Sequence, residues 1–195
     1  MTKIIYIHGF ASSGDSEKAK ALKLAFPKDT VLSPTLSPNP KQAIAQLHSL
    51  ILKVEPVLVI GTSLGGFYAT YIACLYDVPA FIINPSLEPF IDISKILSTH
   101  NGKRIGTNEP YDFKTEYLND LKFLFDKLHA SDKDGYNLNF YLATNDDVLT
   151  FEKLDTLFPN KNHVKTFDNA GHRFSRFSEI FPDVQKVLNT LNNQK

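Results

Sequence analysis

Apolar residues form short continuous runs along the chain, separated by longer stretches in which they recur with helical spacing. Residues 57–60, with the sequence Val-Leu-Val-Ile, form the clearest of the short runs. Runs of this length are typical of strands that are buried on both faces of a parallel sheet. Six segments are predicted as strands: 4–7, 30–32, 57–60, 80–83, 138–142 and near 163–167.

Between these runs, apolar residues recur every three or four positions, as expected of amphipathic helices. Residues 41–53, for example, place Ile44, Leu47 and Ile51 on one face. The predicted helices cover 15–26, 41–53, 64–76, 88–97, 115–129, about 150–157 and about 175–192. Strands that alternate with helices predict an α/β fold. Right-handed crossovers would build a six-stranded, mostly parallel sheet with helices on both faces.

The segment Gly61-Thr62-Ser63-Leu64-Gly65 joins the strand 57–60 to the helix 64–76. In this setting Gly-x-Ser-x-Gly predicts a nucleophile elbow, because so sharp a turn has no room for side chains two residues before and two residues after the serine. The hydroxyl would lie at a helix N-terminus, which favours an oxyanion. The alternative is a glycine-rich turn without chemistry, such as a phosphate cradle. Neither a P-loop lysine nor Gly-x-Gly-x-x-Gly supports that alternative.

A serine hydroxyl is a weak nucleophile until a base takes its proton. His172 is the best candidate among the six histidines, because it lies in a glycine-containing loop before the last helix; the alternative is an ordinary surface histidine. The elbow architecture requires the chain order Ser, acid, His. Asp146 and Asp147 both follow the strand 138–142. We prefer Asp146, because Val148 can anchor its loop, but the spacing leaves Asp147 open.

Two backbone N–H groups are needed to stabilise the oxyanion of an acyl-transfer intermediate. One is expected from Leu64, directly after the nucleophile. The other is expected from the loop after the first strand, with Phe10 as first choice and Ala11 as second. His8 is expected to hold this loop rather than to act as a base.

Composition limits the kind of partner. The formal net charge is +0, from 21 basic and 21 acidic residues, so nucleic acid is a poor candidate. Cys74 is the only cysteine, which excludes an intramolecular disulfide, and no Cys/His cluster has zinc-ligand spacing. No metal site is therefore expected. With neither a signal peptide nor a membrane span in the sequence, we expect a cytoplasmic protein without a membrane partner. The oligomeric state stays open.

These motifs resemble those of the small bacterial esterases of the YqiA/YcfP-like group in the α/β-hydrolase superfamily. The most specific match is Ile-Gly-Thr-Ser-Leu-Gly-Gly-Phe-Tyr-Ala-Thr at 60–70. The other matching segments are 5–13, 83–85, 108–111, 144–149 and 171–174. The chain departs from the family at Gly171, where a polar residue is common, and at Arg173, where a small residue is common.

The resemblance implies a compact α/β-hydrolase fold and a Ser63, Asp146 and His172 triad. The implied activity is the hydrolysis of carboxylic esters or of thioesters such as acyl-CoA, without a cofactor. The substrate would be a small molecule. The resemblance also favours Asp146 over Asp147.

We expect a single α/β-hydrolase domain over 1–195 with a small lid-like insertion around 86–136, where this superfamily places lids. Its modest size predicts an open site for short or flexible acyl groups. Fold alone does not fix function. A non-hydrolytic ligand-binding or interaction protein, and a C–C hydrolase or peptidase with the same triad, remain as alternatives.

Overall fold

The computed structural model describes residues 2–54, 57–130 and 137–193, which are built around a six-stranded sheet. The strand order is β2-β1-β3-β4-β5-β6, and every neighbouring pair is parallel. The strands are β1 (Lys3–Ile7), β2 (Val31–Leu32), β3 (Val57–Thr62), β4 (Ala80–Ile83), β5 (Leu138–Ala143) and β6 (His163–Phe167). The predicted fold class is confirmed. Because all strands run in one direction, the loops that follow them gather at one edge of the sheet.

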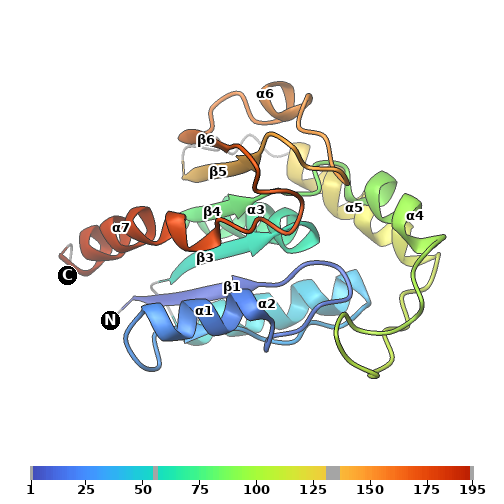
Figure 1. Cartoon of the computed structure of the whole chain (residues 1–195), viewed down its shortest axis with the longest axis horizontal. Helices are drawn as coiled ribbons and strands as arrows, with labels where there is room; N and C mark the ends of the chain where they lie inside the picture. Colours follow the sequence, from blue (N-terminus) through green and yellow to red (C-terminus); the bar gives the residue numbers. More distant parts are fainter. Residues whose placement is uncertain (1, 55–56, 131–136, 194–195) are drawn as a thin grey trace.

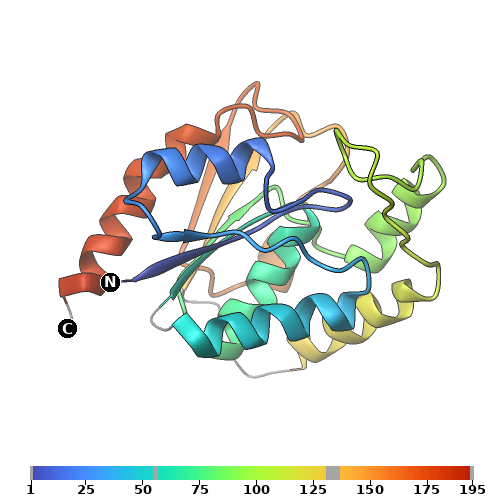
Figure 2. The same cartoon turned by 90° about the horizontal axis from the view of Figure 1, so that it is seen from below.

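Helices cover both faces of the sheet (Figure 1, Figure 2). The longer ones are α1 (Glu17–Ala25), α2 (Pro40–Val54), α3 (Leu64–Tyr76), α4 (Pro89–Leu97), α5 (Tyr117–His129) and α7 (Phe181–Asn193). Alternate side chains of β1 enter different cores. Ile4 and Tyr6 pack with residues of α1 and α7, whereas Ile5 and Ile7 pack with residues of α2, α3 and α5. The continuous apolar pattern of the strand therefore reflects burial on both faces.

Two helix boundaries differ from the prediction. The last helix, predicted from about 175, is preceded by the 3₁₀ turn η1 (Phe177–Ile180) and begins at 181. Phe174 has φ 50°, a left-handed conformation that interrupts a helix, and Pro182 fits the first turn of α7 because it needs no hydrogen-bond acceptor. The helix predicted near 150–157 is the short α6 (Leu154–Leu157), which stops before Pro159.

The segment between β4 and β5 was expected to form a lid-like insertion; its residues 131–136 lie outside the described part. Its helices α4 and α5 are joined by the loop 98–116, which returns towards the end of β1. The Ile105 N–H donates to the Ala11 carbonyl oxygen at 2.7 Å. The Arg104 guanidinium, 10% exposed, donates to the carbonyl oxygens of Ser12 at 2.5 Å and Leu36 at 3.0 Å. The loop is thus anchored to the loops that follow β1 and β2.

The two ends of the described chain lie together, at the edge of the sheet where β1 begins (Figure 1). The Thr2 backbone N–H donates to Asn192 Oδ1 near the end of α7 at 2.9 Å. This edge is opposite the one at which the strands end. Within the described residues, no helix combines the length and the apolar character needed to cross a bilayer.

Candidate active site

Ser63 occupies a sharp turn between β3 and α3. Its backbone has φ 54° and ψ −122°, which is strained for a residue with a side chain. A Cβ on Gly61 would lie 2.1 Å from the Gly65 carbonyl oxygen, and a Cβ on Gly65 would lie 2.2 Å from the Ile7 carbonyl oxygen. Backbone packs directly against backbone here, so both glycines are sterically required. The strand therefore passes into the helix through a turn with room only for glycine two residues before and two residues after Ser63.

The loop after β1 lies against this serine. A Cβ on Gly9 would be 3.2 Å from Ser63 Cβ and 3.8 Å from Ser63 Oγ. The next residue, Phe10, has a buried ring. This ring makes edge-to-face contacts with the rings of His100, Tyr111 and Phe113, at centroid distances of 5.0, 5.1 and 5.3 Å. Phe10 is therefore fixed by the insertion.

Two backbone N–H groups, those of Leu64 and Phe10, have no hydrogen-bond acceptor within the described residues. Leu64 is the first residue of α3, and N–H groups in a first helical turn have no partner within the helix. Among the described residues, the Phe10 N–H has no backbone or side-chain acceptor. Ala11, the second choice for an oxyanion donor, has φ 53°, so the chain turns sharply after Phe10.

His172 and Asp146 form a hydrogen-bonded pair. His172 Nδ1 donates to Asp146 Oδ2 at 2.9 Å and lies 3.1 Å from Oδ1. The Asp146 side chain is only 1% exposed and that of His172 is 21% exposed. Since Nδ1 is engaged by the carboxylate, Nε2 is the nitrogen left for a substrate or a nucleophile.

The Asp146 carboxylate is held in its ionised form. Burial by itself would raise its pKa, but hydrogen bonds from His172 and from the backbone N–H groups of Leu149 and Val148 keep the pKa below its ordinary value. Both N–H groups donate to Oδ1 at 2.9 Å. Asp147, the alternative acid, is exposed, and the hydrogen bonds of His172 Nδ1 go to Asp146 instead.

The segment after β4 brings the serine and the histidine into one neighbourhood. The Ser86 N–H donates to the Ser63 carbonyl oxygen at 3.1 Å, and Asn84 Nδ2 donates to the His172 carbonyl oxygen at 3.2 Å. Among the described residues, no hydrogen bond joins Ser63 Oγ to His172. Hydrogen bonds of this kind are often long before a substrate binds.

His8 uses both ring nitrogens inside the protein, as its expected structural role requires. Nδ1 donates to the Gly9 carbonyl oxygen at 2.8 Å, and Nε2 accepts from the Leu36 N–H at 3.0 Å. Burial lowers the pKa of His8 to about 4, and the charge of Arg104 acts in the same direction. A neutral imidazole with both nitrogens occupied holds the β1 loop and has no free position for proton transfer.

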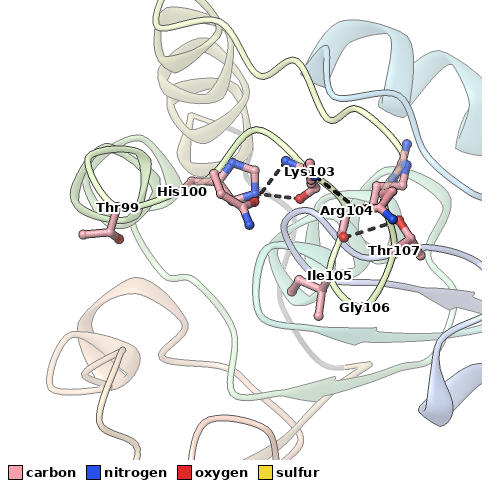
Figure 3. Close-up of a pocket in the computed structure, with 9 residues that line it drawn as sticks. Thr99, His100, Lys103, Arg104, Ile105, Gly106 and Thr107 are labelled. Atoms are coloured by element: carbon pink, nitrogen blue, oxygen red, sulfur yellow. Dashed lines mark hydrogen bonds between the residues drawn. The ribbon is translucent and has the colours of Figure 1, made fainter.

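A hollow of about 580 Å³ lies in the insertion, next to the β1 loop (Figure 3). Residues of the loop 99–108 line it, including His100, Lys103 and Ile105. One of these residues, His100, also contacts the Phe10 ring, but neither Phe10 nor Ser63 lines the hollow. Across the described chain, no group of three or more His, Cys, Asp or Glu side chains is arranged to hold a metal ion.

Three residues around the site were not singled out from the sequence: Asn84, Asn145 and Arg104. Asn145 Oδ1 accepts from the Gly171 N–H at 3.0 Å and so links the aspartate and histidine loops. Asn84 carried a readable signal, since it is a polar residue directly after a buried strand. Arg104 carried none, because its partners Ser12 and Leu36 are distant in sequence.

Sequence comparisons identify relatives along nearly the whole chain. The model of a family described as "Uncharacterised protein family (UPF0227)" matches residues 3–189. UPF0227 protein ECA1814 of Pectobacterium atrosepticum is 27% identical over 180 residues, which cover 86% of this chain and 99% of that protein. UPF0227 protein YcfP of Escherichia coli is 25% identical over 191 residues, covering 94% and 96% of the two chains.

Solved structures share the architecture at low identity. The mouse alpha/beta hydrolase domain-containing protein 10 superposes with a TM-score of 0.71 at 14% identity, covering 97% of this chain and 90% of that one. Est1E from Butyrivibrio proteoclasticus, with ferulic acid bound, gives 0.67 at 14% identity and covers 100% and 90%. The resemblance to the YqiA/YcfP-like group is thus confirmed: the chain belongs to the UPF0227 family and has the α/β-hydrolase fold.

Proposed function

We propose that this protein is a serine hydrolase that cleaves carboxylic esters or acyl thioesters. The observation that carries the proposal is the hydrogen-bonded Asp146–His172 pair, with a buried carboxylate, in the neighbourhood of the strained turn at Ser63. The pair fixes the imidazole with Nδ1 protonated and Nε2 free, the form that a general base needs. The available N–H groups of Phe10 and Leu64 supply the second requirement, an oxyanion site.

The first half of the reaction forms an acyl-enzyme. Ser63 Oγ attacks the carbonyl carbon of the substrate while His172 Nε2 takes the hydroxyl proton. The carbonyl oxygen becomes an oxyanion, which the Phe10 and Leu64 N–H groups stabilise. His172 then gives the proton to the leaving alcohol or thiol as the bond to it breaks, and Asp146 stabilises the imidazolium in between.

The second half repeats these steps with water. His172 Nε2 takes a proton from a water molecule, whose oxygen attacks the acyl carbon bound to Ser63. The proton passes to Ser63 Oγ as the acid leaves, which restores the enzyme. No redox or metal step is needed in this sequence of events.

The substrate class rests on the fold neighbours and on the surroundings of Ser63. Est1E is solved with ferulic acid, a carboxylic acid, bound to it, and another neighbour is the thioesterase domain of a curacin biosynthetic pathway, with a TM-score of 0.60 at 13% identity over 92% of this chain and 89% of that one. The segment 86–136, where this superfamily places lids, is modest in size, which favours an open site beside Ser63. We expect short or flexible acyl groups to be preferred.

The test compares the wild type with Ser63→Ala on p-nitrophenyl acetate, butyrate and octanoate and on palmitoyl-CoA. We expect kcat of the variant to fall by roughly six orders of magnitude, because only binding and the oxyanion site would remain. Ser94→Ala, at an exposed serine on α4, is the matched control and should keep wild-type activity.

Labelling with a fluorophosphonate separates a wrong substrate from a wrong mechanism. A wild type that labels at Ser63 but cleaves no member of the panel has an activated serine and a different substrate. A wild type that neither cleaves nor labels is not a serine hydrolase, and a ligand-binding role would replace this proposal.

A further inference from the structure

Asn84 follows β4 directly and is 1% exposed, with φ 41°. Both ends of its side chain are used. Oδ1 accepts from the Ala143 N–H at 2.8 Å, and Nδ2 donates to the carbonyl oxygens of Gly171 at 2.9 Å and His172 at 3.2 Å. One amide therefore joins the end of β5 to the loop that carries the histidine.

The residues around Asn84 hold the other side of the site. The Ser63 N–H donates to the Ile83 carbonyl oxygen at 3.0 Å, and the Ser86 N–H donates to the Ser63 carbonyl oxygen at 3.1 Å. Pro85 packs so closely on α3 that a Cβ on Gly66 would lie 3.0 Å from Pro85 Cα. The backbone of 83–86 therefore packs against and hydrogen bonds to the turn at Ser63, while the side chain of Asn84 hydrogen bonds to the histidine loop.

We propose that Asn84 is a positioning residue that sets the separation between His172 and Ser63. The inference rests on the proposed function, since it assigns how the base is held relative to the nucleophile. Few side chains could replace it. The position needs a neutral acceptor and a neutral donor within one short side chain, and asparagine tolerates a left-handed backbone better than most residues.

The geometry explains why the effect should be on chemistry rather than on substrate affinity. Asn84 contacts only the backbone of the histidine loop, through the carbonyl oxygens of Gly171 and His172, and does not contact the imidazole. If residue 84 had no hydrogen-bond donor, the two carbonyl oxygens would lose their partner. They would then repel an oxygen placed there, or move towards water. The imidazole would then shift relative to Ser63 Oγ, and proton transfer depends steeply on that separation.

Two substitutions remove the donor in different ways. Asn84→Asp keeps an acceptor for the Ala143 N–H but faces the Gly171 and His172 carbonyl oxygens with a carboxylate. Asn84→Gly removes the side chain at a backbone conformation that glycine adopts freely. For both we expect kcat with p-nitrophenyl acetate to fall by about 10- to 100-fold while KM stays within about twofold, because a displacement of about 1 Å can cost that much.

Asn139→Asp is the matched control. Asn139 is also a buried asparagine, 8% exposed, and its Nδ2 donates to the Ala80 carbonyl oxygen at 3.0 Å and to that of Asn137 at 3.4 Å. It lies near the start of β5, at the other end of the strand from the site. This variant should lose thermal stability and keep the wild-type kcat.

A second readout does not depend on turnover. Hydrogen–deuterium exchange over residues 168–176 reports the order of the histidine loop, whose Gly171, Phe174 and Ser175 N–H groups are hydrogen bonded. Exchange there should rise in both Asn84 variants and stay unchanged in Asn139→Asp.

The outcomes separate this inference from the proposed function. An Asn84→Gly variant with wild-type kcat and unchanged exchange overturns the positioning role even if the wild type is a good esterase. An equal loss of kcat in Asn139→Asp also overturns it, because the loss would then follow from stability. If the wild type has no hydrolase activity, raised exchange over 168–176 in the Asn84 variants alone still supports the positioning, and unchanged exchange rejects it.

Discussion

The two halves of the candidate site are built by different means. On the nucleophile side, β3, the elbow and the β1 loop are fixed by backbone that packs against backbone, so that Gly61 and Gly65 have no room for a methyl group. On the base side, the loops of Asp146 and His172 are held by hydrogen bonds from side chains, among them Asn84 and Asn145.

This difference teaches where each kind of mutation should act. Close backbone packing cannot relax without moving whole strands, so changes on the nucleophile side should lower the stability of the protein. A side-chain hydrogen bond can be lost while the strands stay in place, so changes on the base side should lower activity and leave the fold intact.

Apart from the loss of the nucleophile itself, the largest effect is expected on the base side, from Asp146→Asn. An amide there can still accept the Val148 and Leu149 N–H groups, but its NH₂ would favour the wrong tautomer of His172. We expect kcat to fall by about 10³- to 10⁴-fold with little change in Tm. Asp147→Asn is the control and should stay within about twofold of the wild type in steady-state assays. The reverse order of the two effects would transfer the acid role to Asp147.

On the nucleophile side, Gly65→Ala should act on folding. The new methyl group would meet the Ile7 and His8 carbonyl oxygens at 2.2 and 2.4 Å, and neither can move without displacing β1. We expect the free energy of unfolding to fall by about 3 kcal/mol in urea titrations. Gly106→Ala, with φ 75° in open space, should cost only about 1–2 kcal/mol. Equal losses in the two variants would contradict the tight packing of the elbow.

His8 connects the nucleophile side to pH. Its pKa is lowered to about 4 in the folded protein, whereas an unfolded histidine titrates near 6.5. The free energy of unfolding is therefore highest above pH 6.5 and falls as the pH drops towards 4, because the histidine of the unfolded chain is protonated at a higher pH than that of the folded protein. Between pH 7.5 and 5, we expect the wild type to lose about 2 kcal/mol more unfolding free energy than His8→Gln, whose amide does not titrate. Parallel pH profiles would reject a neutral, buried His8.

The smallest effect is expected from Arg104, whose side chain holds the loop after β1 through hydrogen bonds to backbone. Arg104→Ala would leave the Ser12 and Leu36 carbonyl oxygens without their donor and loosen the loop that carries Phe10. We expect kcat/KM to fall by about tenfold, less than the loss of a direct oxyanion donor. Lys23→Ala, on α1 and away from this loop, loses only an exposed ion pair with Asp15 and should show wild-type kinetics. An Arg104→Ala variant with increased activity would instead indicate an insertion that obstructs the site.

A structural feature could be predicted from the sequence when residues close together in the chain determine it. The passage from β3 through the elbow to α3 is determined within about twenty residues, by an apolar run, two glycines and a second apolar run, so the sequence was sufficient. The start of α7 was placed too early because Phe174 adopts φ 50° while it packs against Phe167, at a centroid distance of 5.1 Å. That contact belongs to the tertiary structure.

Site residues divide in the same way. Spacing brought both Asp146 and Asp147 to the right loop, but only the turn in which Oδ1 of Asp146 accepts two N–H groups determines which carboxylate faces His172. Arg104 was not predictable for a stronger reason. It lies 92 residues from Ser12, and no local pattern encodes a contact over that distance.

The hydrogen bond between Thr2 and Asn192 brings the two ends of the described chain together, which is useful for attaching or rejoining them. Since residue 2 and the end of α7 meet at the edge of the sheet that faces away from Ser63 and His172, an affinity tag or a surface tether at either end should leave the entrance for substrate clear (Figure 1). The same adjacency makes the chain suitable for circular permutation, with a short linker across the two ends and a new opening in an exposed loop such as 27–29.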